Sequence, residues 1–209
     1  MRRKQWVFSI LLFAVSLSFL LYSKYLFPPA PVPALQASDS VASAEQCGTV
    51  LLVNKDYYPF LREHFRNARH KIVGTVYLLK TANYRYNEPA DLIRELIAAR
   101  KRNVDVELVV DLSAADHASN EMNRNASRIL QEAGVKVHFD TTDVSTHSKS
   151  FVIDDRYCFV GSHNLTHSAM AVNEELSVYV DSAEMAKKIT EFIRQIPLSN
   201  PEKAEKNQE

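Results

Sequence analysis

The chain has 209 residues, of which 46% are hydrophobic, so it is long enough for one domain with a sizeable core and terminal attachments. Residues 1–46 hold four of its 25 basic and two of its 25 acidic residues, which leaves 21 basic and 23 acidic residues in the remainder. This near-neutral balance argues against a strongly basic nucleic-acid-binding domain, although it leaves room for a local basic groove.

The first 27 residues predict a membrane anchor or a signal segment. Three basic residues at positions 2–4 precede an uncharged, apolar run at residues 6–22, which as a helix would span about 25 Å. A cleaved signal peptide is the alternative, but the small residues Ala42-Ser43-Ala44 lie far beyond the apolar run. We favour an uncleaved anchor. Both alternatives place the folded domain outside the cytoplasm, in the periplasm or at the cell surface, and cleavage would release it as a secreted protein.

The folded domain is expected at residues 47–196, between two segments of different composition. Residues 28–46 contain four prolines followed by an Ala/Ser-rich stretch, which is typical of a stiff linker. The charged residues 197–209 predict a disordered tail.

Strand and helix patterns alternate through this domain. We expect strands at residues 49–53, 71–79, 104–112, 135–139 and 175–180, and helices at 58–68, 89–102, 120–133 and 182–194. Pro89 suits the first turn of its helix, and Gly134 suits the position after the end of the next one. Such alternation predicts an α/β fold in which helices flank a central mixed β-sheet.

A hairpin and its continuation, residues 146–175, hold the side chains most suited to catalysis. Two β-prone runs flank an Asp154-Asp155-Arg156 turn. The hairpin contains three short motifs, H-x-K-x4-D, G-S-x-N and N-x-E, whose functional residues are His147, Lys149, Asp154, Ser162, Asn164 and Glu175. Side chains alternate along a strand, so His147 and Lys149 are expected on one face, beside the end of the partner strand at Ser162.

These residue types suit attack on a phosphodiester. A neutral imidazole such as that of His147 is a nucleophile near neutral pH. Lys149 and Asn164, assisted by Ser162, would stabilise the charge that develops on the phosphate oxygens, and neither a metal nor another cofactor is required. Glu175 would orient the imidazole. The leaving oxygen needs an acid, and a two-fold homodimer supplies a second His147 most simply.

The motifs resemble those of the phospholipase D superfamily, and in length and order the chain is most similar to the single-motif bacterial endonucleases of the Nuc type. The resemblance covers about residues 49–196. It implies that His147 is the nucleophile, that its copy in the partner is the acid, and that Ser162 and Asn164 bind substrate. Asp154 is the motif aspartate, and we expect it to pin the hairpin turn.

The resemblance favours a metal-independent nuclease acting through a covalent phosphohistidine, with DNA as the favoured substrate. A polar loop with Tyr84, Arg85 and Tyr86 could stack on bases and contact phosphate. A phospholipase D or phosphatidyl transferase acting on the nearby bilayer is the alternative. A third possibility is a non-catalytic, membrane-tethered nucleic-acid-binding protein.

The sequence also raises a zinc site and a disulfide. His163 and His167 are four residues apart and Cys158 is near, but this spacing is common by chance, so we expect no metal. Cys47 and Cys158 are the only cysteines, and the sequence leaves open whether they pair.

Overall fold

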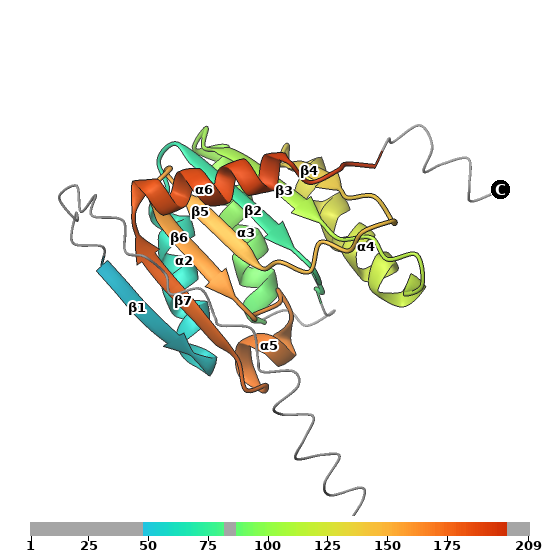
Figure 1. Ribbon diagram of the computed structural model, residues 1–209, viewed down its shortest axis with the longest axis horizontal. Coiled ribbons are helices and arrows are strands. Elements are labelled where there is room, and N and C mark those ends of the chain that lie inside the picture. The colour runs from blue at the N-terminus through green and yellow to red at the C-terminus, as the bar shows by residue number, and fades with distance from the viewer. Residues whose placement is uncertain (1–47, 82–86, 200–209) are drawn as a thin grey trace, which may run out of the picture. The chain divides into compact units, whose positions relative to one another are not determined.

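The computed structural model describes residues 48–81 and 87–199 (Figure 1). Its strands are β1 (Gly48–Val53), β2 (Lys71–Val76), β3 (Asp105–Val110), β4 (Lys136–Phe139), β5 (Ser150–Ile153), β6 (Tyr157–Gly161) and β7 (Leu176–Asp181). Its helices are the 3-10 turn η1 (Asn54–Asp56), α2 (Tyr57–Asn67), α3 (Glu88–Lys101), α4 (His117–Glu132), α5 (His167–Ala171) and α6 (Ala183–Arg194).

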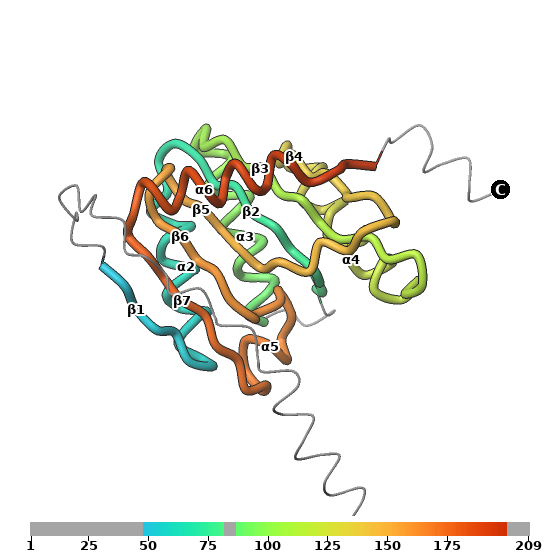
Figure 2. Tube along the Cα trace, in the orientation of Figure 1, coloured from blue at the N-terminus to red at the C-terminus, as the bar shows by residue number. Residues whose placement is uncertain are grey.

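The strands form one seven-stranded sheet in the order β1-β7-β6-β5-β2-β3-β4. β2, β3 and β4 are parallel, whereas β5, β6, β7 and β1 pair antiparallel with their neighbours, so the sheet is mixed. α6 crosses one face of the sheet, and α2 and α3 lie on the other (Figures 1 and 2). The predicted fold class is therefore confirmed.

The core is divided between the two faces of the sheet. The larger cluster combines apolar side chains of α2, α3 and α4 with one face of the strands, including Phe65, Leu96 and Phe151. On the other face, α6 packs on Val73, Val152 and Cys158. Since successive strand residues point to opposite faces, the near-continuous apolar runs of β2 and β5 reflect burial on both sides.

The hairpin of β5 and β6 forms as predicted and is fixed by Asp154. Asp154 and Asp155 both have positive φ (52° and 51°), as the two central residues of a type I′ turn require, and the Arg156 N–H closes this turn by donating to the Ile153 carbonyl (3.1 Å). The Asp154 carboxylate accepts hydrogen bonds from the backbone N–H groups of Arg69 (3.0 Å), His70 (2.7 Å) and Lys71 (3.0 Å). The turn is thereby tied to the connection between α2 and β2.

Several predicted boundaries are wrong. β2 ends at Val76 instead of residue 79, because the Leu79 N–H turns away to the side chain of Asn123 (2.7 Å) and Leu79 bridges to Leu165. α4 begins at His117, three residues earlier than predicted, because Asp116 caps it by accepting the Ser119 N–H (3.0 Å). The short helix α5 was not predicted.

The start of the predicted disordered tail is also ordered. The Pro197 carbonyl accepts the Thr141 N–H (3.0 Å), and the Ser199 N–H donates to the Phe139 carbonyl (2.8 Å). Residues 197–199 therefore extend the edge of the sheet beside β4, and only residues 200–209 of the expected tail lie outside the described residues.

The expected anchor, the linker and Cys47 lie outside the described residues, as do Tyr84, Arg85 and Tyr86. Within residues 48–81 and 87–199, none of the helices has the length and apolar character needed to cross a bilayer.

We predict that Asp154→Asn lowers the free energy of unfolding at pH 7 by about 2–3 kcal/mol, because an amide cannot replace a carboxylate that accepts several N–H groups. Burial alone would raise the pKa of Asp154, but the N–H groups of Lys71, His70 and Arg69 outweigh it and hold this pKa below its usual range. The stabilisation is therefore present above the unfolded pKa of about 3.9 and is lost as pH falls further.

Urea unfolding of the full-length chain at pH 7 and pH 3.5 measures this difference. Asp155→Asn is the matched control, because Asp155 shares the left-handed backbone but is exposed. Equal stability of wild type and Asp154→Asn at pH 7 would contradict the assigned role.

Candidate active site

The candidate site lies where the ends of several strands meet. Some of these strands end there, and others, which run in the opposite direction, begin there. β5 runs antiparallel to β2, with Ser150 opposite Thr75, so the residues just before β5 lie beside the end of β2. β6 and β7 meet at the same edge, where Gly161 is opposite Ser177. His147, Lys149, Ser162 and Glu175 all fall at these strand ends, although they belong to different segments of the chain.

Lys149 and His147 are arranged around the ring of Tyr77. The Lys149 ammonium lies 4.4 Å from the centre of that ring and donates to the His147 carbonyl (2.6 Å). The His147 imidazole meets the same ring at a centroid distance of 4.3 Å. His147 is exposed, whereas Lys149 is buried. The His147 imidazole is thus exposed to solvent, beside an ammonium group that is held in place.

The environment of Lys149 suits a phosphate ligand. Burial lowers the pKa of the Lys149 ammonium, and the negative charges of Glu175 and Asp111 oppose this effect. A buried ammonium without a directly bonded carboxylate keeps capacity for an anion, because its remaining N–H donors are not committed to an ion pair. These charges also place Glu175 and Asp111 within electrostatic reach of Lys149.

Ser162 and Glu175 are joined by a side-chain hydrogen bond. The Ser162 hydroxyl donates to the Glu175 carboxylate and accepts the Leu176 N–H (3.1 Å), and Asn173 donates to the other carboxylate oxygen (3.0 Å). The Gly161 N–H donates to the Lys149 carbonyl (3.2 Å), which connects this pair to the Lys149 segment. Within the described part of one chain, Glu175 is therefore bonded to Ser162 and Asn173, and not to His147.

Asn54 and His163 hold the Glu175 segment from behind. Asn54 accepts the Glu175 N–H through its side chain (2.7 Å) and donates its own N–H to the Glu175 carbonyl (2.9 Å). The buried His163 ring bridges the Asn54 carbonyl (2.9 Å) and the Ser177 hydroxyl (2.7 Å), and it stacks on Tyr57. These contacts give a structural reason for the His within G-S-x-N.

Steric crowding explains why glycine occupies position 161 in this motif. A Cβ atom at Gly161 would lie 2.0 Å from the Ser177 hydroxyl oxygen, which is the oxygen that His163 contacts. Any larger residue would push Ser177 and the adjoining strand away.

Asn164 and Asp154 differ in their relation to the cluster. The Asn164 side-chain oxygen is buried and has no hydrogen-bond partner among the described residues. Asn164 follows Ser162 closely in sequence. Asp154 lies at the opposite end of β5 from His147 and so belongs to the scaffold.

The sequence reasoning missed Tyr77, Asp111, Asp140 and Asn123. Tyr77 and Asp111 directly follow the parallel strands β2 and β3, at their carboxyl ends. Polar and aromatic residues in that position are typical of a functional edge in α/β sheets, and this signal was available in the sequence.

The three residues of the zinc hypothesis lie in different surroundings. Cys158 is buried beneath α6, His163 bridges Asn54 and Ser177, and His167 pairs with Glu88 (2.6 Å). In the part of the chain that the structure describes, no three His, Cys, Asp or Glu side chains are close enough together to hold a metal ion.

Comparisons with known proteins agree with this geometry. Residues 61–196 match the family model described as "Cardiolipin synthase, PLD-like domain". A polyphosphate kinase of Xylella fastidiosa is 26% identical over 178 residues, covering 81% of this chain and 25% of that protein. A cardiolipin synthase A of Buchnera aphidicola is 25% identical over 146 residues, covering 68% and 27%. The chain thus spans about a quarter of the length of these relatives.

A solved structure reproduces the fold over nearly its whole length. The crystal structure of Nuc from Salmonella typhimurium, a phospholipase D family member, superposes with a TM-score of 0.61 at 20% identity. The match covers 74% of this chain and 99% of that one. At this identity the likeness concerns the fold.

We predict that His163→Gln flattens the pH dependence of stability. Burial lowers the pKa of His163, and the bond to the Asn54 carbonyl and the charge of Glu175 oppose this only in part. As pH falls below the unfolded value of about 6.5, the unfolded chain takes up a proton that the folded ring resists, so wild type loses stability. The variant should be less stable at pH 7, and the difference should shrink at pH 5.

Unfolding of both proteins at pH 7, 6 and 5 tests this, with His117→Gln, at an exposed histidine at the start of α4, as the control. A wild-type slope that persists unchanged in His163→Gln would assign the pH dependence to other groups.

Proposed function

The chain belongs to the phospholipase D-like family, and from that premise we propose that it is a metal-independent phosphodiesterase that cleaves nucleic acid through a covalent phosphohistidine. The proposal rests on one observation: His147, Lys149, Ser162 and Glu175 lie at the same end of the sheet, where their strands end or begin. An exposed imidazole above a buried ammonium is the arrangement that nucleophilic attack on an anionic phosphate requires.

The reaction would take place in two displacements. The His147 imidazole forms a bond to phosphorus, and the bond from phosphorus to the leaving oxygen breaks as that oxygen takes a proton from a second histidine. Water then attacks the phosphohistidine, gives its proton to the second histidine and releases His147. Lys149 and Asn164 would bind the non-bridging oxygens in both steps, and Ser162 would assist them.

The second histidine would come from another copy of the chain. Each chain has one H-x-K-x4-D motif, and one imidazole cannot be the nucleophile and the general acid in the same step. A two-fold axis near His147 brings two identical edges together, so each copy supplies what the other lacks. In this arrangement Glu175 of one chain is also available to the imidazole of the other.

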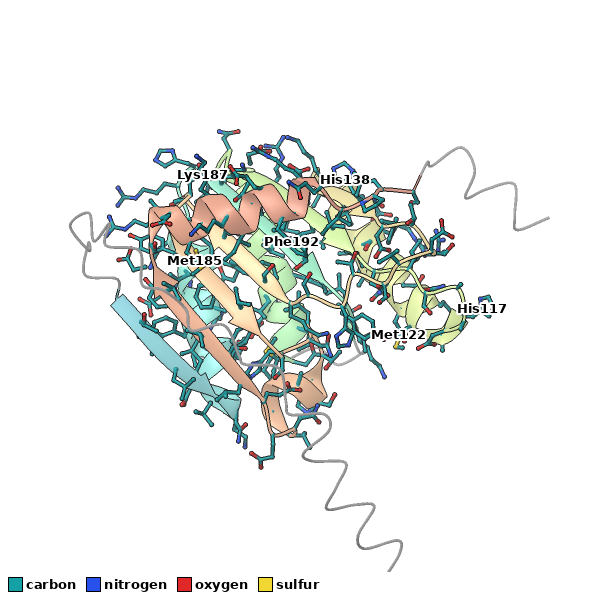
Figure 3. All side chains as sticks on the ribbon, in the orientation of Figure 1. His117, Met122, His138, Met185, Lys187 and Phe192 are labelled. Atoms are coloured by element: carbon teal, nitrogen blue, oxygen red, sulfur yellow. The ribbon has the colours of Figure 1, made fainter. Side chains whose placement is uncertain are left out.

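An exposed apolar surface beside the site supports this dimer. α6 packs on one face of β2, β5 and β6, where it contacts Cys158. Val160 is two residues after Cys158 and therefore points to the same face. Val178 and Leu51, on β7 and β1, lie beside it in one cross-strand row. The apolar face, as we name this surface, consists of exposed Leu51, Val53, Val160 and Leu176 with Met185 and Phe192 on α6 (Figure 3). It reaches the site directly, because Leu176 follows Glu175.

Nucleic acid is the favoured substrate because the single-motif arrangement resembles the bacterial endonucleases. Tyr84, Arg85 and Tyr86 lie outside the described residues, but their side chains are of the types that stack on bases and contact phosphate. The apolar run near the N-terminus supports a location outside the cytoplasm, anchored to the membrane. The cardiolipin synthase relatives make phospholipid the substrate to test alongside.

We predict that the full-length chain cleaves single-stranded or plasmid DNA in the presence of EDTA, and that His147→Ala lowers the rate at least about 1,000-fold, because the nucleophile is lost. The measurement is a gel assay run in parallel with release of headgroups from phospholipid vesicles. His117→Ala, at another exposed histidine, should keep wild-type activity.

Headgroup release without DNA cleavage would contradict the nuclease function and assign a phospholipase function instead. Silence on both substrates would favour a non-catalytic binding protein. Cleavage that EDTA abolishes, or that survives in His147→Ala, would contradict the mechanism.

We predict that Leu51→Glu converts a dimer into a monomer and lowers nuclease activity at least about 100-fold, because a charge on the apolar face cannot be buried without a partner. Val50→Glu is the matched control, since Val50 is the neighbouring exposed residue on the opposite face of β1. Sedimentation of the full-length chain in detergent measures the oligomeric state. A dimeric and active Leu51→Glu protein would exclude this interface.

A further inference from the structure

His147 is not part of a strand, so something other than the sheet must hold it. Residues 141–149 connect β4 to β5 without regular structure, and His147 is exposed. The ring contact with Tyr77 and the bond from Lys149 to its carbonyl hold its near side. The residues immediately before it, Ser145 and Thr146, are held by two buried carboxylates.

Asp140 provides the first of these attachments. Its side chain is almost completely buried (1% exposed) and accepts the backbone N–H of Thr146 (2.9 Å) and of Leu112 (2.6 Å) on its two oxygens. Its own N–H donates to the Val110 carbonyl (3.1 Å). Asp140 thus joins the residue before His147 to the end of β3.

Asp111 provides the second attachment. It is 3% exposed, and its carboxylate accepts a hydrogen bond from the Ser145 hydroxyl (2.7 Å). The buried amide of Asn123 donates to the backbone carbonyls of both Asp111 and Tyr77 (2.9 Å each). The aromatic ring that contacts His147 and the segment that precedes His147 are therefore anchored to the same point.

We propose that Asp111 and Asp140 are positioning residues that set the orientation of the His147 imidazole through Ser145 and Thr146. The proposal rests on the function proposed above and adds a carboxylate clamp that none of the catalytic motifs contains. The clamp touches neither the phosphate nor the reacting nitrogen. It acts by fixing the backbone from which the imidazole projects, where an error of about 1 Å can cost about 100-fold in rate.

Burying the carboxylates of Asp111 and Asp140 near each other has an electrostatic cost, which indicates that they do more than fill space in the core. Burial raises the pKa of Asp140, the hydrogen bonds from Thr146 and Leu112 oppose this, and the nearby charge of Asp111 raises it further. Against the effect of burial, which lowers the pKa of Lys149, the charge of Asp111 in turn raises it. Two buried carboxylates side by side are unfavourable unless their positions are used.

The test compares three single variants of the full-length chain. Asp140→Asn keeps the shape but can accept only one of the two N–H groups. Ser145→Ala removes the contact to Asp111 at an exposed residue and leaves the core untouched. Asp143→Asn makes the same chemical change as the first variant at an exposed position of the same connection and is the matched control.

We expect kcat for DNA cleavage to fall about 30- to 100-fold in Asp140→Asn and about 5- to 10-fold in Ser145→Ala, with KM changed less than threefold. Asp143→Asn should match wild type. A second measurement does not depend on the reaction. The rate of carbethoxylation of His147, followed by mass spectrometry, should differ at least threefold from the wild-type rate in both Asp140→Asn and Ser145→Ala. The other histidines serve as internal standards.

The outcomes separate the clamp from the proposed function. An inactive wild type would overturn the nuclease, and the carbethoxylation rates alone would then decide on the clamp. If Asp140→Asn does not fold, Ser145→Ala decides it. Unchanged kcat and unchanged His147 reactivity in the folded variants would overturn the proposal, as would a loss that appears only in KM.

Discussion

The carboxylate of Asp154 fixes the register on which the candidate site depends. It receives three consecutive backbone N–H groups from the connection into β2, and the Asp154 N–H returns a bond to the Lys71 carbonyl (2.8 Å). Because β5 then pairs with β2 in a single register, Ser150 must lie opposite Thr75. A slip of one residue would turn every side chain of β5 to the other face. Lys149 would then leave the ring of Tyr77.

Hydrogen bonds between hydroxyl groups fix the pairing of β2 with β5 at the strand ends beside the candidate site. The Ser148 hydroxyl donates to that of Thr75 (2.9 Å), and Thr75 and Ser150 are also bonded (2.8 Å). Such bonds contribute only about 1 kcal/mol each, but leaving one of these buried groups unpaired costs more. These hydroxyl groups therefore select one pairing of β2 with β5 more strongly than they stabilise the domain. Specificity of register is what a site assembled from several strands needs.

The sequence predicted those parts of the molecule that depend on neighbours along the chain. The hairpin and the left-handed Gly134 after α4 follow from short patterns of residues. The contacts that complete the site join residues far apart in sequence, such as Asn54 with Glu175, and they depend on a strand order that periodicity does not reveal. The end of β2 was misplaced for the same reason, since only the amide of Asn123, a distant residue, draws Leu79 out of the sheet.

In the proposed dimer, the site shared by two chains and the apolar face would meet the same requirement. Within the described chain, His147 is exposed and Glu175 is engaged with Ser162, so in a single copy a phosphate beside His147 would stay in contact with water, where its attraction to Lys149 is weak. Burying Leu176 and Val160, which adjoin Glu175 and Gly161, would remove water from both edges at once. A lower local dielectric would strengthen the interaction of Lys149 with phosphate in the same step that supplies the second imidazole. Association and activation would then be a single event, which explains why an apolar surface borders the most polar part of this molecule.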